Sequence, residues 1–304
     1  MALSLDVRRK VPAALRTLLE REFDQSLRRL DQAAGDRPAD RVEGVHEYRR
    51  SVKRLRAALQ LASGVVPAAE LHRIDRALSD AARRLGTLRD AHARRIAAER
   101  VAMLLPKVWR ALAMDAWRSS GGMVTEAAAD LPQASVQSLL QASRSDMQAI
   151  RVRVQALKLD AMRAQTVADA VADAWRRART RFNASWEDRD EAWLHGARKR
   201  AQRAANLLVL VGGWGGRWSA ATEWRLRRAS GLLGEARDSE LMLERMPAVA
   251  PDAPLHEVVR RVREVATKRR KAALRESRRE GRAALRLGRG ACRKRLMSAI
   301  DRAP

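Results

Sequence analysis

The chain has 304 residues, enough for one large domain or for two smaller ones that each have a core. Hydrophobic residues make up 46% of it, and 62 Lys and Arg against 36 Asp and Glu give a net charge of +26. This composition excludes a disordered basic tail and favours an anionic partner, such as nucleic acid, an acidic membrane surface or a phosphate polymer. The single cysteine, Cys292, excludes an intrachain disulfide framework and fits a reducing compartment.

Charged residues interrupt the apolar stretches. The charges of Asp6, Arg8 and Arg9 interrupt the N-terminal stretch, so it cannot form the apolar h-region of a secretory signal peptide. The longest apolar run, 207–211, ends at Gly212 and is far shorter than the roughly 18–20 residues that span a bilayer. The sequence therefore predicts a soluble, cytoplasmic protein without a membrane partner.

Helix-forming residues dominate and alternating strand patterns are hard to find, so the predicted fold class is all-α. Pro38 and Pro67 lie between predicted helices, and the last helix is expected to break near Gly281 or Gly288. In chain order, the predicted helices cover about 5–34, 42–64, 68–105, 107–118, 134–159, 166–184, 190–212, 217–246 and 254–299.

Two motifs occur twice in the same order. Segment 45–55 (VHEYRRSVKRL) matches segment 194–204 (LHGARKRAQRA), with an offset of 149 from His46 to His195. Segment 85–90 (LGTLRD) matches segment 233–238 (LGEARD), with an offset of 148. We therefore predict an internal duplication into residues 1–160 and 161–304, each with roughly four helices, enough for a bundle.

The first motif of each repeat predicts a helix divided into a basic and an apolar face. In the first repeat the basic face falls within an arc of about 160° and follows Asp40 and Glu43, which are spaced like a capping box. Cations four residues apart without acidic partners repel each other, so an anion that neutralises them explains the pattern better than a solvated face does. The basic side chains are His46, Arg49, Arg50, Lys53, Arg54 and Arg56, and then His195, Arg198, Lys199 and Arg203.

Both histidines stand at the N-terminal end of the basic helix, at the positive pole of its dipole. Each could donate a hydrogen bond to a phosphoryl oxygen, or could be a structural residue with a buried hydrogen bond. The Arg-Asp pairs of the second motif, 89–90 and 237–238, also leave two interpretations open. They are ordinary surface pairs, or the aspartates orient basic side chains of the neighbouring helix while the arginines join the cationic surface.

The C-terminal stretch 260–295 holds 16 Lys and Arg against 3 Glu. Its apolar spacing is still that of an amphipathic helix. It either extends the cationic surface or forms a separate nucleic-acid patch.

The pattern His-x-x-Arg-[Arg/Lys]-x-x-x-Arg, followed about 40 residues later by Leu-Gly-x-x-Arg-Asp and then duplicated, resembles the CHAD domain, the conserved histidine α-helical domain, over roughly residues 5–300. The resemblance implies two four-helix bundles related by a pseudo-two-fold axis, with a basic central cavity or groove. It also implies binding of inorganic polyphosphate and association with polyphosphate granules. The binding residues that it implies are His46, Arg49, Arg50, Lys53, Arg54, Arg56, Arg89, His195, Arg198, Lys199, Arg203 and Arg237, with Asp90 and Asp238 as orienting residues. Gln202 and Ala205 replace Lys53 and Arg56 in the second repeat, which is therefore expected to bind less strongly.

The motifs that would indicate an enzyme are missing. His46-Glu47 begins like the zinc motif HExxH, but Arg50 replaces its second histidine. No phosphate-binding GxxxxGK[ST] loop is present, and neither basic face supplies a carboxylate pair for Mg²⁺. We therefore expect no catalytic residue, no metal and no cofactor, and multivalent capture of the polyanion without base readout.

Two alternatives remain. The first is a nucleic-acid-binding helical protein, because some of the eight tryptophans could stack on bases, although most lie in apolar helical patterns typical of a core. The second, less favoured, is an enzyme, either in a histidine phosphorelay or a phosphohydrolase.

Overall fold

The computed structural model describes residues 4–6, 9–35, 37–86, 99–100, 102–119, 133–184, 186, 190–245 and 253–300. Apart from one isolated bridge between Ser63 and Val66, the regular elements of these residues are helices, which confirms the predicted all-α class. They are α1 (Val11–Ala33), α2 (Pro38–Gln60), α3 (Ala68–Arg84), α5 (Lys107–Ser119), α6 (Gln133–Gln155), α7 (Ala164–Asn183), α8 (Glu191–Leu210), α9 (Gly212–Arg245), α10 (Ala253–Ala284) and α11 (Arg289–Ile300).

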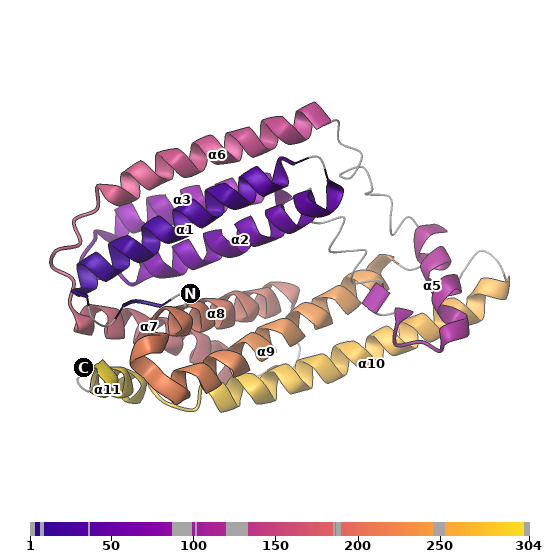
Figure 1. Cartoon of the computed structure of the whole chain (residues 1–304). Coiled ribbons are helices and arrows are strands. Elements are labelled where there is room, and N and C mark those ends of the chain that lie inside the picture. The colour runs from indigo at the N-terminus through magenta and orange to yellow at the C-terminus, as the bar shows by residue number, and fades with distance from the viewer. Residues whose placement is uncertain are drawn as a thin grey trace.

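The helices form two groups, which lie one above the other in Figure 1. In the upper group, α1 packs against α2 and α6, and α3 packs against α2 and α6. In the lower group, α9 lies between α8 and α10, while α7 contacts α8, α10 and α11. Helix α1 buries an apolar stripe, in which Leu15, Leu18, Leu19 and Leu30 recur at helical spacing.

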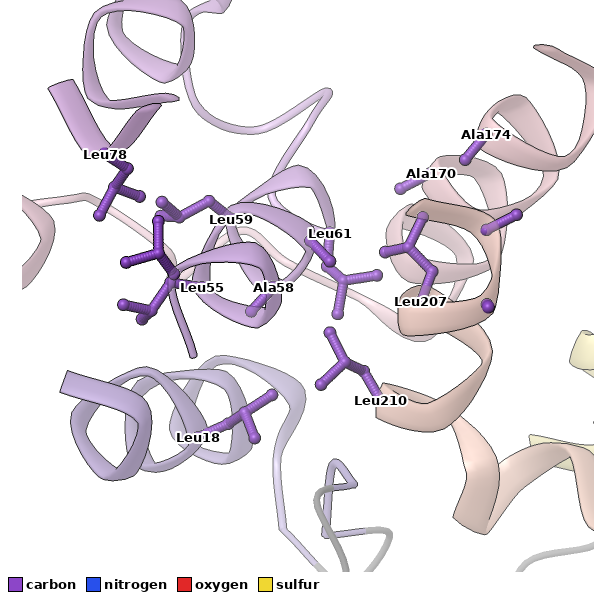
Figure 2. Packing of buried hydrophobic residues seen from close by; sticks show 14 of the residues in the cluster. Leu18, Leu55, Ala58, Leu59, Leu61, Leu78, Ala170, Ala174, Leu207 and Leu210 are labelled. Carbon is purple, nitrogen blue, oxygen red and sulfur yellow. The ribbon is translucent and has the colours of Figure 1, made fainter. Parts of the chain in front are cut away.

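One hydrophobic core runs through both groups. Figure 2 shows Leu61, the residue that ends α2, directed toward Leu207 and Leu210 of α8. The N-terminal segment joins the same region, because the amide of Leu5 donates a hydrogen bond of 2.7 Å to the carbonyl oxygen of Leu210. This shared core fixes α2 relative to α8, which are the two helices that carry the first motif.

A second, smaller core lies where α5 packs against α10. It joins Leu105 and Ala113 to Val258, Val259 and Val262, all buried. In Figure 1 this contact lies toward the end of α10 remote from α11. A helix from residues 107–119 thus packs on an element that follows it by more than a hundred residues.

Several helix limits differ from those predicted. Helix α2 begins at Pro38, which occupies its first turn, so Asp40 and Glu43 lie inside the helix and the predicted capping box is wrong. Helix α3 ends at Arg84 and does not extend through residue 105. The predicted break in the last helix lies at residues 285–288 beside Gly288, whereas Gly281 lies inside α10.

The main part of α9 follows Gly216, whose φ of +54° interrupts the helix. That conformation costs little for glycine because it has no Cβ. The predicted start at residue 217 agrees with this interruption.

Cys292 is buried on α11, and its burial raises the pKa of its thiol to about 12. No helix within the described part of the chain combines the length and apolar character needed to cross a membrane.

Candidate functional site

Helices α2 and α8 are divided between apolar and basic sides as the wheel predicts. Val45, Tyr48, Val52 and Leu55 of α2 are buried, as are the alanines at 197, 201 and 204 of α8. Of the predicted binding residues on these helices, those exposed to solvent are His46, Arg50 and Lys53 on α2, and His195 and Lys199 on α8. These five side chains are the members of the predicted set that a large ligand can reach most directly.

The first arginine of each motif packs against the glycine of the second motif. A Cβ added at Gly86 would lie 3.7 Å from Nη1 of Arg49, and one added at Gly234 would lie 3.1 Å from Nη2 of Arg198. Arg49 Nη1 also donates a 2.5 Å hydrogen bond to the carbonyl oxygen of Ala82. At both places the glycine, which has no Cβ, leaves room for a guanidinium.

Arg54 belongs to the interior of the first group. Its Nε lies 2.9 Å from a carboxylate oxygen of Glu22 on α1, and the two side chains are 12% and 1% exposed. Arg54 Nη2 also donates to the hydroxyl of Ser51 at 2.7 Å. Burial raises the pKa of Glu22, although Arg54 opposes the shift. The pair therefore ties α2 to α1, and its surroundings leave little room for a ligand.

Asp75 on α3 joins the two basic helices. Arg56 of α2 donates to both of its carboxylate oxygens, at 2.8 and 2.7 Å, and Arg203 of α8 donates to one of them at 2.8 Å. Burial opposes ionisation of Asp75, but the hydrogen bonds and charges of the two arginines outweigh it and hold its pKa below the ordinary value of 3.8. Arginines from the basic helices of both predicted repeats thus meet around one carboxylate.

Two arginines outside the predicted set lie close to these side chains, Arg227 of α9 and Arg177 of α7. Burial, followed by the charges of Arg50 and Arg54, lowers the pKa of Arg227 on α9. Burial lowers the pKa of Arg203 despite Asp75, and the charges of Arg56 and of Arg177 on α7 act in the same direction as burial. Arg177, Arg227 and Asp75 were missed by sequence analysis because none of them belongs to a repeated motif.

The second motif of the second repeat lies beside the first turn of α8. Arg237 of α9 contacts three carboxylates, those of Glu191 at 2.7 Å, Glu240 at 3.4 Å and Glu244 at 3.2 Å. It lines a small depression together with His195 and Arg198. The charge of Arg237 is thus largely neutralised within the protein, and its predicted role in ligand binding stays a prediction.

The pKa of His195 lies below its ordinary value of 6.5. Although the side chain is largely exposed, its partial desolvation is the largest cause; the positive charges of Lys199 and Arg198 add to it, whereas Glu191 opposes it. The imidazole is therefore mainly neutral at pH 7 and has an N–H to donate.

Two predicted residues cannot be compared with their expected places, because Arg89 and Asp90 lie outside the described residues. Asp238 is half-buried on α9, and its predicted orienting role stays a prediction.

Much of the charge of the C-terminal stretch is paired. Arg269 and Arg270 of α10 contact Glu235 and Glu240 of α9, and Arg228 of α9 contacts Glu276 of α10. Lys271, Arg286 and Lys294 remain exposed. The stretch therefore cross-links α9 and α10 while keeping some cations at the surface.

Within the described ranges, no three His, Cys, Asp or Glu side chains are grouped as metal ligands. Trp175 and Trp193 are buried, as the predicted core role requires. Trp224 is different, because its side chain is 60% exposed on α9 beside Arg225 and Arg228.

An all-helical domain with basic helix faces brought together by a shared core defines the class of protein. The family model of the CHAD domain matches residues 17–213, and the chain belongs to this family. It is also similar in structure to the CHAD domain from the plant Ricinus communis, with a TM-score of 0.58, 20% sequence identity, and coverage of 94% of this chain and 95% of that chain. At that identity the similarity shows a shared fold. No curated protein matches the chain.

Proposed function

We propose that this protein binds inorganic polyphosphate without catalysing a reaction, through the cationic side chains of α2 and α8. The observation that supports this best is the meeting of Arg56 and Arg203 on Asp75, which holds the basic helices of both predicted repeats next to each other. Arg227 adds a third helix to the same positive region, since its pKa responds to Arg50 and Arg54. The protein would serve to attach itself, or a partner, to polyphosphate granules.

The proposed site is the product of an internal duplication into two four-helix bundles, α1, α2, α3 and α6 in one and α7, α8, α9 and α10 in the other. The contact of Arg49 with Gly86 and of Arg198 with Gly234 supports this, because the same pair of motif positions meets in each group. The stacking of the two groups in Figure 1 supports it further.

The proposed mechanism is multivalent electrostatic capture. Arg50 is 54% exposed and pairs with Glu47 at i−3, a surface pair of small strength that a phosphate can replace. Lys53 and Lys199 are exposed on the two helices, and each histidine can donate a hydrogen bond to a phosphoryl oxygen. Each bound phosphate releases counterions, so the affinity should fall steeply as salt rises.

A competition titration tests the choice of ligand. Labelled long-chain polyphosphate is bound at about 150 mM salt, and single-stranded DNA, duplex DNA and RNA are added as competitors. Polyphosphate should remain bound when each competitor is present at an equal concentration of phosphate. Displacement by any of the nucleic acids at equal phosphate would refute polyphosphate as the preferred ligand.

Substitution of two lysines tests the site. Lys53→Gln with Lys199→Gln removes two positive charges, one from each basic helix, and should lower the affinity for long polyphosphate by about tenfold or more. The matched control, Arg153→Gln with Lys158→Gln, removes two exposed charges at the end of α6 and just after it, away from the basic helices. Equal losses in both double variants would show that only net charge matters and would refute the site.

Trp224 supports a second candidate function, the binding of single-stranded nucleic acid. An exposed indole can stack on a base, and Arg225 and Arg228 could exchange their pairs with Glu280 and Glu276 for phosphates. If this is the function, Trp224→Ala should weaken binding of single-stranded DNA by about tenfold and leave polyphosphate binding unchanged, because stacking on a base contributes roughly 1–3 kcal/mol.

A further inference from the structure

Asp75 lies in a strongly positive cluster. Arg56, Arg203 and Arg177 give three positive charges against its one negative charge. Its side chain is 29% exposed, so solvent and a ligand can reach the cluster. The four residues come from α2, α8, α7 and α3, and therefore from both groups of helices.

The carboxylate uses the donors that a phosphate would need. Arg56 presents Nε and Nη2 to the two oxygens of Asp75, which is the bidentate geometry by which arginine also binds phosphate. Arg203 directs Nη2 to one of the same oxygens. A phosphate can take these hydrogen bonds only if it displaces Asp75 from them.

We propose that Asp75 is an internal competitor for Arg56 and Arg203, and that this competition makes the site favour long phosphate chains over short phosphates. The proposal rests on the proposed function, and it assigns Asp75 as the residue that sets the chain-length preference. Asp75 is a positioning residue here, because it acts through the two arginines.

The preference for long chains follows from the hydrogen bonds and charge contacts that a ligand gains and breaks when it displaces Asp75. A short phosphate that displaces Asp75 exchanges one set of charge-assisted hydrogen bonds for another, and it leaves a partly buried carboxylate without its partners. A long chain that is already bound to Arg50, Lys53 or Lys199 brings its next phosphates to the cluster at high effective concentration. Only the long chain can therefore compensate for the displacement.

The second repeat contains an acid at the equivalent place. Glu223 on α9 stands 148 residues after Asp75, which is the offset between the two Leu-Gly-x-x-Arg-Asp motifs. Glu223 pairs with Arg227, the arginine that lies near Arg50 and Arg54. Each half thus has an acid at this offset that pairs with an arginine of the positive region: Asp75 pairs across the two groups, and Glu223 pairs within α9.

The test compares triphosphate with long-chain polyphosphate in the wild type and in Asp75→Asn, by calorimetric titration. The affinity for triphosphate should rise by about tenfold or more, because the competitor has lost its charge, while the affinity for the long chain should rise by no more than about threefold. The matched control is Asp31→Asn, which removes an exposed carboxylate that pairs with Arg144 between α1 and α6. In that variant the ratio of the two affinities should equal that of the wild type.

An unchanged ratio in Asp75→Asn with wild-type circular dichroism would refute the proposal. If Asp75→Asn does not fold, Arg56→Gln is compared with the double variant Arg56→Gln and Asp75→Asn, in which Arg203 and Arg177 keep their charges. Triphosphate should then bind more tightly to the double variant, and equal binding would refute the proposal. Failure of the proposed function gives a different result, because the wild type itself would not bind the long chain.

Discussion

Arg54 and Lys53 are neighbours in the sequence, but their surroundings differ. Arg54 is paired with the buried Glu22, whereas Lys53 is exposed. Removal of one partner of a buried ion pair leaves the other charge without compensation. A charge count alone would give both residues the same role, and only the packing separates a structural arginine from a lysine that is proposed to bind the ligand.

We therefore expect Arg54→Ala to lower the free energy of unfolding by about 3–5 kcal/mol, and Lys53→Ala to change it by no more than about 0.5 kcal/mol. Urea denaturation followed by circular dichroism measures both values. A loss below about 1 kcal/mol in Arg54→Ala would mean that the pair with Glu22 is not buried as the structure has it.

His195 should make polyphosphate binding depend on pH. Burial, Lys199 and Arg198 hold its pKa below 6.5 in the free protein, and a bound polyanion would raise that pKa. Binding should then take up protons, so the affinity should increase as the pH falls from 7.5 to about 5.5. Calorimetric titration in two buffers with different ionisation enthalpies measures the number of protons taken up on binding. His195→Gln should reduce this number. An unaltered proton uptake in that variant would assign the effect to another group.

At the scale of elements, the packing of a guanidinium on a glycine distinguishes the two predicted repeats. An added Cβ meets Arg198 at 3.1 Å over Gly234, but meets Arg49 at the ordinary contact distance of 3.7 Å over Gly86. Gly234→Ala must therefore shift Arg198, whereas Gly86→Ala leaves Arg49 in place. Both variants should stay folded, because the atoms that have to move are the far end of a flexible side chain.

We expect Gly234→Ala to weaken polyphosphate binding by about threefold to tenfold and Gly86→Ala by less than about twofold. Fluorescence titration with the long chain measures both, and thermal denaturation verifies the fold. The reverse order of the two losses would contradict the proposed part of Arg198 in the site.

The sequence predicts elements better than it predicts their ends. Helix periodicity identified the divided faces of α2 and α8, because apolar side chains that recur every 3.6 residues place one stripe on one side of a helix. It missed the start of α2, because Pro38 fits the first turn of a helix as well as it fits a turn between helices. It also joined residues 68–105 into one helix, since helix propensity alone does not indicate the end at Arg84.

The candidate site was predictable only in its repeated part. Repetition singled out the histidines and the basic side chains of both motifs, but it could not find partners that occur once. Asp75, Arg177 and Arg227 can be recognised as part of the site only from contacts between elements that are far apart in the chain. The same contacts decide which predicted cations are engaged inside the protein, as Arg237 is with three glutamates.

At the scale of the whole molecule, Asp75 joins the two groups of helices, and its titration should appear in the acid stability of the fold. Its pKa is held below 3.8 by the two arginines, so its contribution to stability is complete above that value and is lost as the pH falls through the lower, folded-state pKa. The difference in unfolding free energy between the wild type and Asp75→Asn should be constant above about pH 5 and should shrink toward pH 2. Urea titrations across this range measure it, and a difference that grows on acidification would contradict the sign of the pKa shift.

The buried thiol described on α11 has a practical consequence for labelling. With its pKa raised to about 12 and no access to solvent, Cys292 should not react with maleimides at neutral pH while the protein is folded. A new cysteine at an exposed position such as Val152 could then carry a fluorophore at one place only, without prior removal of the native sulfhydryl. Two such cysteines, one on each helical group, could carry a donor and an acceptor dye, and energy transfer between the dyes would report whether the separation of the groups alters when a phosphate polymer is added.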